Sequence, residues 1–353
     1  MSSTTSRCAR RWALRAATVA LGLLTTVAAL LGAWLLYAAL RLDSTEKLTR
    51  QQAAPAGGRW LQAGDTQVHV VDSGPAGAPP LLLVHGTGAW AGTWASNIAA
   101  LQSAGFRVVA MDLPPFGFSV MLANRDYSRR AQAQRILAVA AQLGPDPVTL
   151  LAHSFGGGPA AEAAMLEPSR FAHLVLVDAA IALGPEQAPP CEPPHGAANL
   201  LAWRGLRTLL VAGVATEPAF STHWLEQFVA RKEVVTVQRT AIYQKPFAVQ
   251  GFSEGLGDWA WQFATGCEQP ASTRPASFRQ LQLPVSLVWG DLDTITPLAQ
   301  AQQLKALLPR AQLVMLQGVG HIPQIEDVAG FNAAAVRVLR QPPAAGNTER
   351  GTR

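Results

Sequence analysis

The sequence predicts an α/β protein with a mostly parallel sheet that is covered by helices on both faces. Short, wholly apolar runs such as 81–84 and 148–152 are typical of parallel strands that are buried on both sides. Segments with helical periodicity, such as 127–143, lie between these runs, and strands that alternate with helices favour a parallel sheet. Because 49% of the 353 residues are hydrophobic and only 14% are charged, the chain can build one large core.

The expected elements begin with an antiparallel pair of strands, 60–61 and 66–71, around the turn signal Gly64-Asp65. Parallel strands are expected at 81–84, 107–111, 148–152, 174–177, 285–289 and 312–316. Helices are expected at 98–101, at 127–143 with Asp126 or Ser128 as the N-cap, at 157–166, after Pro297 and at 328–339.

This alternation is interrupted between residues 181 and 283. The region is rich in Pro, Trp and Gln and has helical stretches at 199–212 and 222–231, which predicts a mainly helical insertion. The insertion divides the core into two parts, 58–180 and 284–340. The C-terminal segment 341–353 contains Pro, Gly and Thr and is expected to be disordered.

An uncharged stretch of 25 residues, 16–40, lies near the N-terminus. As a helix it is about 37 Å long, whereas the hydrocarbon core of a membrane is about 30 Å thick. Trp12, Trp34 and Tyr37 lie near its ends, where amphipathic rings favour the membrane interface. The sequence therefore predicts a transmembrane anchor at 16–40, followed by a linker at 41–57.

The basic arm 1–15 predicts the orientation of this anchor. The arm has four arginines, and no acidic residue occurs before residue 41, so the N-terminus is expected in the cytoplasm. The remainder would then lie outside the cytoplasm, in the periplasm if the cell is Gram-negative. A cleaved signal peptide is the competing interpretation, but its apolar part spans only about 7–15 residues, and 36–41 offers no clear cleavage site.

Charge and cysteine content limit the expected partners. The net charge is +5, but the arginines of the arm supply +4 of it, so no nucleic-acid partner is expected for the folded domain. No Cys/His cluster has zinc-ligand spacing, so neither a metal nor another cofactor is expected. Cys8 precedes the anchor. Cys191 and Cys267 both lie in the insertion, where a disulfide between them is expected outside the cytoplasm; two separate thiols are the alternative.

Ser154 is the candidate nucleophile. It lies in 152–157, which follows a predicted strand and opens a predicted helix, and such a tight turn exposes a serine at the edge of the sheet. The residues two before and two after it must be small because they nearly touch, and they are Ala152 and Gly156. A serine hydroxyl is a weak nucleophile unless a base accepts its proton.

His321 is the candidate base, since it lies between glycine-rich residues just after the last predicted strand. The acid that orients it should follow the preceding strand, where Asp291 and Asp293 both occur. Asp178 ends another strand and is a third candidate. An acid at the Nδ1 atom of His321 would set its tautomer and stabilise the imidazolium.

Backbone donors are also needed, because negative charge develops on the substrate carbonyl oxygen. The run 85–88, His-Gly-Thr-Gly, follows the first parallel strand, and its Thr87 N–H is the expected donor together with the N–H of Phe155; Gly88 is the adjacent alternative. His85 and His153 are expected to shape their loops by hydrogen bonding.

These segments occur in one order along 81–340: His85-Gly86-Thr87-Gly88, 112–119, 152–156, Trp289-Gly290 with Asp293 and Pro297, and Gly320-His321. The set resembles the α/β-hydrolase superfamily. The resemblance implies an eight-stranded sheet, a cap inserted after the sixth strand and an acid three residues after Gly290, which favours Asp293. Dehalogenases and epoxide hydrolases of this superfamily have Asp as the nucleophile, so Ser154 argues against both activities.

The function expected from these features is hydrolysis of a lipophilic carboxylic ester, by a carboxylesterase or lipase that forms an acyl-enzyme on Ser154. A C–C bond hydrolase or an aminopeptidase with the same three residues is an alternative, as is a non-catalytic ligand-binding protein of this fold. Four tryptophans of the insertion are candidates for an apolar substrate pocket or for a small core of the insertion: Trp203, Trp224, Trp259 and Trp261.

Overall fold

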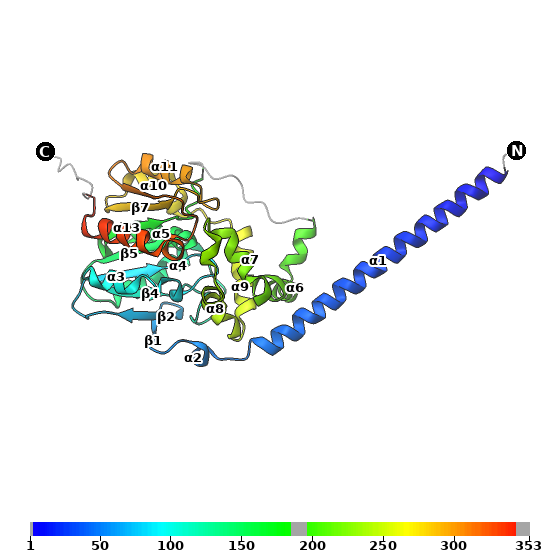
Figure 1. The fold of residues 1–353 in the computed structure, drawn as a ribbon, viewed down its shortest axis with the longest axis horizontal. Helices are drawn as coiled ribbons and strands as arrows, with labels where there is room; N and C mark the ends of the chain where they lie inside the picture. The colour runs from blue at the N-terminus through cyan, green and yellow to red at the C-terminus, as the bar shows by residue number, and fades with distance from the viewer. Residues whose placement is uncertain (1–2, 185–195, 344–353) are drawn as a thin grey trace.

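The computed structural model describes residues 3–184 and 196–343 (Figure 1). One eight-stranded sheet has the order β1-β2-β4-β3-β5-β6-β7-β8, and only the pairs β1–β2 and β2–β4 are antiparallel. The predicted fold class is therefore confirmed. The strands are β1 (Gly58–Ala63), β2 (Thr66–Ser73), β3 (Pro80–Val84), β4 (Arg107–Met111), β5 (Val148–His153), β6 (Phe171–Val177), β7 (Val285–Gly290) and β8 (Gln312–Leu316).

Helices cover both faces of the sheet. Leu82 of β3 belongs to the same hydrophobic core as Ile136 of α4 (Arg129–Ala141), whereas its neighbour Leu83 belongs to a second core with Phe331 of α13 (Val328–Arg340), because successive strand residues point to opposite faces. Ser128 caps α4, since its hydroxyl accepts the N–H of the third helical residue. The helices of the sheet domain are α3 (Ile98–Ser103), α4 (Arg129–Ala141), α5 (Gly157–Leu166), α11 (Leu298–Leu307), α12 (Pro323–Glu326) and α13 (Val328–Arg340).

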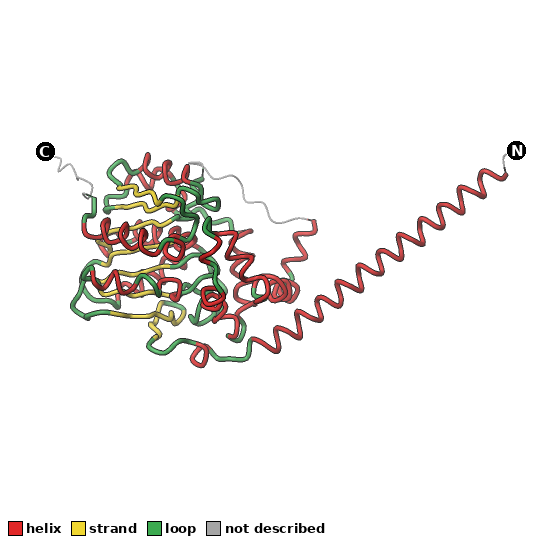
Figure 2. Tube along the Cα trace, in the orientation of Figure 1, coloured by secondary structure: helices red, strands yellow, loops and turns green. Residues whose placement is uncertain are grey.

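The described part of the segment between β6 and β7 is helical and forms a cap at one end of the sheet (Figure 2). Because the chain enters the cap from the carboxyl end of β6, the cap lies over the edge at which the parallel strands end. Its longer helices are α6 (Arg204–Leu210), α7 (Pro218–Phe228), α8 (Val237–Gln244), α9 (Phe252–Thr265) and α10 (Pro275–Gln280), and they are joined by the π-helix η5 (Val211–Ala215) and by the 3₁₀ helices η4 (Gly196–Ala202), η6 (Lys232–Val234), η7 (Lys245–Ala248) and η8 (Ala271–Thr273).

The N-terminal helix α1 (Ser3–Thr45) is longer than the predicted stretch 16–40 and leaves the domain as a single rod (Figure 1). Residues 14–33 are exposed along their whole length. From Trp34 onward the helix packs on the cap: a Cβ atom on Gly213 of η5 would lie only 2.5 Å from the Trp34 ring. The expected linker 41–57 thus begins with the docked end of α1 and also contains the short helix α2 (Arg50–Ala53).

A buried ion pair fastens α1 to the cap. The Nε atom of Arg41 lies 2.6 Å from the Oε2 atom of Glu217, and the two side chains are only 9% and 11% exposed. The Arg41 guanidinium also donates to the carbonyl oxygens of Ala212 and Thr216, and the Tyr37 hydroxyl donates to Glu217. The guanidinium therefore has both a countercharge and backbone acceptors, as a buried charge requires.

We predict that Arg41→Ala lowers the free energy of unfolding by about 3–5 kcal/mol, because it leaves the Glu217 carboxylate buried without its partner. Arg59→Ala is the matched control: Arg59 also pairs with a carboxylate, that of Asp72, but its own side chain is 45% exposed. An exposed pair contributes about 0–1 kcal/mol. Denaturant unfolding of the full chain in mild detergent measures both, and equal losses would contradict the prediction.

Candidate active site

The turn that carries Ser154 has little space around it. Ser154 follows β5 directly and has a φ of +50°, a left-handed conformation that non-glycine residues rarely adopt. A Cβ atom on Gly156 would lie 2.5 Å from the His85 carbonyl oxygen, and one on Gly157 would lie 2.5 Å from the Ala179 Cβ atom. The strand-to-helix turn can therefore form only because glycine occupies the second and third positions after the serine.

Three side chains from distant parts of the chain meet at this turn. The Ser154 Oγ atom lies 2.8 Å from the His321 Nε2 atom, and the His321 Nδ1 atom lies 2.8 Å from the Asp293 Oδ2 atom. Ser154 follows β5, Asp293 follows β7 and His321 follows β8, so all three lie at the carboxyl edge of the sheet. All three are buried beneath the cap. The structure thus brings together the three residues that the sequence analysis selected.

Asp293 is held as a carboxylate. Its Oδ1 atom accepts the backbone N–H groups of Ile295 and Thr296, at 2.8 and 3.0 Å, and its Oδ2 atom accepts the Thr296 hydroxyl at 2.5 Å. Burial alone would raise the pKa of Asp293, but its hydrogen bond and charge interaction with His321 and its bonds from Thr296 lower that pKa below its ordinary value. Because a carboxylate only accepts hydrogen bonds, His321 carries its proton on Nδ1, and Nε2 is free to accept from Ser154.

Asp291 and Asp178, the competing acids, have other partners. The Asp291 Oδ1 atom accepts the N–H groups of Gly318 and Val319, at 2.7 and 3.3 Å, and so shapes the loop that leads to His321. The Asp178 Oδ1 atom accepts the Gly290 N–H at 2.9 Å. Burial and the nearby charge of Asp293 raise the pKa of Asp178 well above its ordinary value. Protonation of Asp178 is therefore favoured by its surroundings, whereas the partners of Asp293 favour the carboxylate.

His85 and His153 support the loops around the serine. The His85 Nδ1 atom donates to the Gly86 carbonyl, and its Nε2 atom accepts the Leu113 N–H at 3.0 Å. The His153 Nε2 atom donates to the carbonyl oxygen of His321 at 2.7 Å. Burial lowers the pKa of His85, and burial together with His321 lowers the pKa of His153 to about 3, so both rings are neutral.

The loop 85–88 lies against the serine. A Cβ atom on Gly86 would come within 2.7 Å of the Ser154 Cβ atom. Thr87, the next residue, is exposed. Phe155 follows Ser154 within the 3₁₀ turn Ser154–Gly156. The two expected backbone donors, Thr87 and Phe155, thus belong to segments that flank the Ser154 side chain.

The four tryptophans of the cap are not gathered at one place. Trp259 lies at the site: its ring is 5.2 Å from that of Phe155 and stacks on Phe263. The other three lie elsewhere. Trp203 and Trp224 are exposed, and the Trp261 ring is covered by the guanidinium of Arg207.

Sequence reasoning missed the connection between the cap and the loop of His321. The Phe228 carbonyl, at the end of α7, accepts the His321 N–H at 2.8 Å. The buried Glu326 carboxylate accepts the N–H groups of residues 230–231 in the cap and of Gly320 beside the histidine. The only signal in the sequence is an acidic residue five positions after His321.

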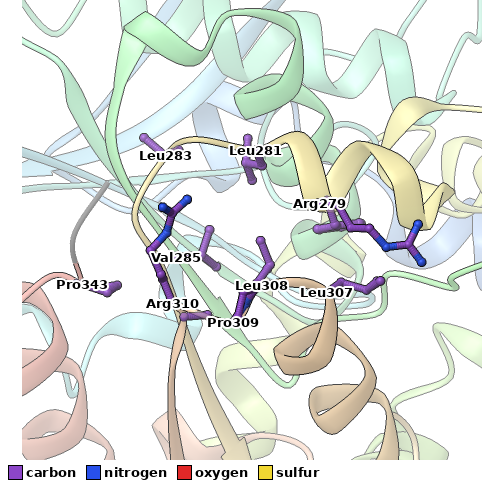
Figure 3. A pocket seen from close by; sticks show the side chains of 11 residues that line it. Arg279, Leu281, Leu283, Val285, Leu307, Leu308, Pro309, Arg310 and Pro343 are labelled. Atoms are coloured by element: carbon purple, nitrogen blue, oxygen red, sulfur yellow. The ribbon is translucent and has the colours of Figure 1, made fainter. Parts of the chain in front are cut away.

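The hollow in Figure 3, of about 230 Å³, is not part of this site. Its lining includes Val285, where β7 begins, together with Leu307 and Leu308 from the end of α11. It therefore lies at the opposite edge of the sheet from Asp293. Among residues 3–184 and 196–343, no three His, Cys, Asp or Glu side chains form a group that could hold a metal ion. Cys191 lies outside the described residues, so its pairing with Cys267 stays a prediction.

The sequence profile described as "alpha/beta hydrolase fold" matches residues 79–328, and the chain belongs to this family. A 2-hydroxy-6-oxononadienedioate/2-hydroxy-6-oxononatrienedioate hydrolase from Cupriavidus pinatubonensis is 25% identical over 291 residues, which cover 79% of this chain and 93% of the relative.

Two solved structures share the fold. A meta-cleavage product hydrolase from Pseudomonas fluorescens is 23% identical, with a TM-score of 0.63, and the match covers 80% of this chain and 98% of that one. A membrane phospholipase A, described as a bacterial virulence factor, is 23% identical, with a TM-score of 0.62 and coverage of 92% and 98%. A match over 92% of this chain must extend into its first 57 residues.

We predict that Asp178→Asn raises the melting temperature relative to the wild type, and more at pH 8 than at pH 4. The raised pKa of Asp178 means that its contribution to stability is fully present below the ordinary pKa and is lost as the pH rises. Asparagine is neutral at every pH, and its side-chain oxygen can still accept the Gly290 N–H. Thermal unfolding across this pH range measures the difference, and a difference independent of pH would contradict the assignment.

Proposed function

We propose that the protein is a serine hydrolase that cleaves a lipophilic carboxylic ester through an acyl-enzyme on Ser154. The observation that carries the proposal is the continuous chain of hydrogen bonds from Ser154 through His321 to Asp293, with both distances to the imidazole at 2.8 Å. A nucleophile, a base and an acid that orients the base are the arrangement that acyl transfer needs.

The reaction proceeds in two halves. The Ser154 Oγ atom attacks the ester carbonyl carbon while His321 Nε2 takes the hydroxyl proton, and the N–H groups of Thr87 and Phe155 stabilise the oxyanion. When the tetrahedral intermediate collapses, His321 gives the proton to the departing alcohol and the acyl group stays on Ser154. A water molecule then attacks this acyl group, with His321 again as the base, and releases the acid and the free serine.

The side chains near Ser154 favour an apolar acyl group. Phe155 contacts Phe116 and Trp259, and Trp259 stacks on the exposed ring of Phe263, so aromatic faces extend from the nucleophile toward the surface. Aromatic rings bind apolar groups and offer no countercharge to a carboxylate.

A C–C bond hydrolase is the second candidate. It is supported by the relative that hydrolyses 2-hydroxy-6-oxononadienedioate, a dicarboxylate. Such a substrate needs cations. The rings that lie next to Ser154, those of Phe155, Trp259 and Phe263, supply no such charge, which favours the ester.

We also propose that α1 spans a membrane, with the arm 1–15 in the cytoplasm and the hydrolase domain on the other side. The segment Leu14–Thr45 is long and apolar enough to span, and its most apolar part is not covered by the domain. A retained anchor is favoured over a cleaved signal, because the end of the same helix, from Trp34 to Thr45, packs on the cap through Arg41 and Glu217.

We predict that a fluorophosphonate probe labels the wild-type protein and does not label Ser154→Ala, because the probe reacts only with an activated serine. Hydrolysis of p-nitrophenyl esters should increase from acetate to longer acyl chains and vanish in Ser154→Ala. An unlabelled wild type would indicate a non-catalytic binding protein. Labelling without ester turnover, with turnover of a 2-hydroxy-6-oxo-dienoate, would favour the C–C hydrolase.

We predict that Asp293→Asn lowers kcat by about four orders of magnitude, since an amide at this position favours the wrong tautomer of the histidine. Asp291→Asn is the matched control: its amide oxygen can still accept the N–H groups of Gly318 and Val319, so kcat should fall by less than about tenfold, which is about 1.4 kcal/mol in the barrier. Steady-state rates on one ester decide between them. A larger loss in Asp291→Asn would transfer the role to that residue.

A further inference from the structure

One edge of the cap exposes large apolar side chains. Leu200 and Leu201 lie on η4, and Trp203 lies between η4 and α6; these side chains are 62%, 38% and 70% exposed. Single exposed apolar residues are common on soluble proteins, but a cluster within four consecutive positions marks a surface that another apolar partner covers. We call Leu200, Leu201 and Trp203 the cap edge.

The cap edge lies beside α1. Helix α6 packs against α1, and Figure 1 shows α6 next to the docked part of that helix. A groove of about 390 Å³ lies between them, with Trp203 and Leu206 on one side and Leu35 and Leu42 of α1 on the other. Leu35 is only two residues from the exposed stretch 14–33, and it lines the same groove as Trp203. Trp203 therefore lies close to the point along α1 at which that helix leaves the protein.

We infer that the cap edge inserts into the interfacial layer of the bilayer that α1 spans, so that phospholipid is the partner of this surface. The inference rests on the proposed membrane span of α1. Two features favour lipid over a second copy of the chain. The cap edge is continuous with a helix whose exposed part is apolar on all sides, and tryptophan prefers the interfacial layer, where its ring is in apolar surroundings and its N–H is hydrated.

A second attachment point restricts how the domain tilts on the membrane. Helix α1 alone allows the domain to rotate about one rod, whereas a second contact at the cap edge fixes the face that the cap turns toward lipid. Helix α6 packs on α9, which carries Trp259 and Phe263 beside the nucleophile turn. The cap edge therefore places the lipid surface one helix away from the aromatic side chains next to Ser154.

The test is fluorescence quenching by lipid in the full chain. An amino acid with a nitrobenzoxadiazole group is introduced at position 203, at position 24 of α1, or at position 237, and each protein is reconstituted in phosphatidylcholine–phosphatidylglycerol vesicles with brominated acyl chains. Val237 is the matched control, since it is 80% exposed but lies in α8, which is bonded to Trp90 of the sheet domain through Ile242. We expect strong quenching at 24, at least twofold quenching at 203 and none at 237.

The possible outcomes distinguish insertion of the cap edge from the membrane span of α1. Quenching at 24 without quenching at 203 would overturn the inference and leave the membrane span intact. Absence of quenching at both positions would overturn the span and the inference together. A third outcome is that the probe at position 203 leaves water only at a high protein-to-lipid ratio, without quenching by the brominated lipid. In that case a second copy of the chain covers the cap edge, and the inference is wrong.

A variant supplies an independent readout. Leu200→Asp places a charge on the cap edge without touching the packed side of the cap, so hydrolysis of a water-soluble p-nitrophenyl ester should stay within twofold of the wild type. Hydrolysis of an ester embedded in vesicles should fall at least fivefold, whereas Val237→Asp should change neither rate. Equal vesicle activity in Leu200→Asp and Val237→Asp would overturn the inference.

Discussion

The strained turn at Ser154 is the constraint on which the site depends. A φ of +50° at a serine is costly, and it persists because the surrounding strands and loops leave no other path for the chain. The turn points the hydroxyl away from the sheet edge, toward the loops that follow β7 and β8. Glycine at 156 lets the loop 85–88 approach from the other side. The backbone conformation of Ser154 therefore sets two distances of its hydroxyl group, one to His321 and one to the expected backbone donors.

Several carboxyl groups lie around this turn, and their partners distinguish their roles. Asp293 has the imidazole and three donors of its own loop, so it stays charged. Asp178 accepts one backbone N–H, and burial together with the charge of Asp293 raises its pKa well above the ordinary value. Asp291 and Glu326 bind backbone N–H groups of the loop that carries His321. Asp293, Asp291 and Glu326 thus hold His321 and its loop in place, and of these three only Asp293 bonds to the ring.

The cap contacts both His321 and the N-terminal helix α1. Helix α7 begins next to Glu217, which is bound by Arg41 of α1, and ends at Phe228, whose carbonyl accepts the N–H of His321. The Phe228 ring also lies 5.8 Å from the imidazole ring. A single helix of 11 residues therefore joins the helix that leaves the domain to His321, the base of the proposed reaction.

Local sequence patterns were enough to predict the fold class, the long apolar helix and the meeting of Ser154, Asp293 and His321, since these follow from apolar runs, an uncharged stretch and motifs at strand ends. Side-chain contacts between residues that are far apart in the sequence leave no local pattern of this kind. The Arg41–Glu217 pair joins residues 176 positions apart, and the sequence around either residue gives no sign of its partner. Likewise, only the packed structure separates Trp259, which lies beside the nucleophile, from Trp203, which lies on the exposed cap edge. The direction of each tryptophan depends on how the helices of the cap pack on the sheet and on α1. That packing depends on all the side chains that these elements bury together, and no short stretch of sequence contains them.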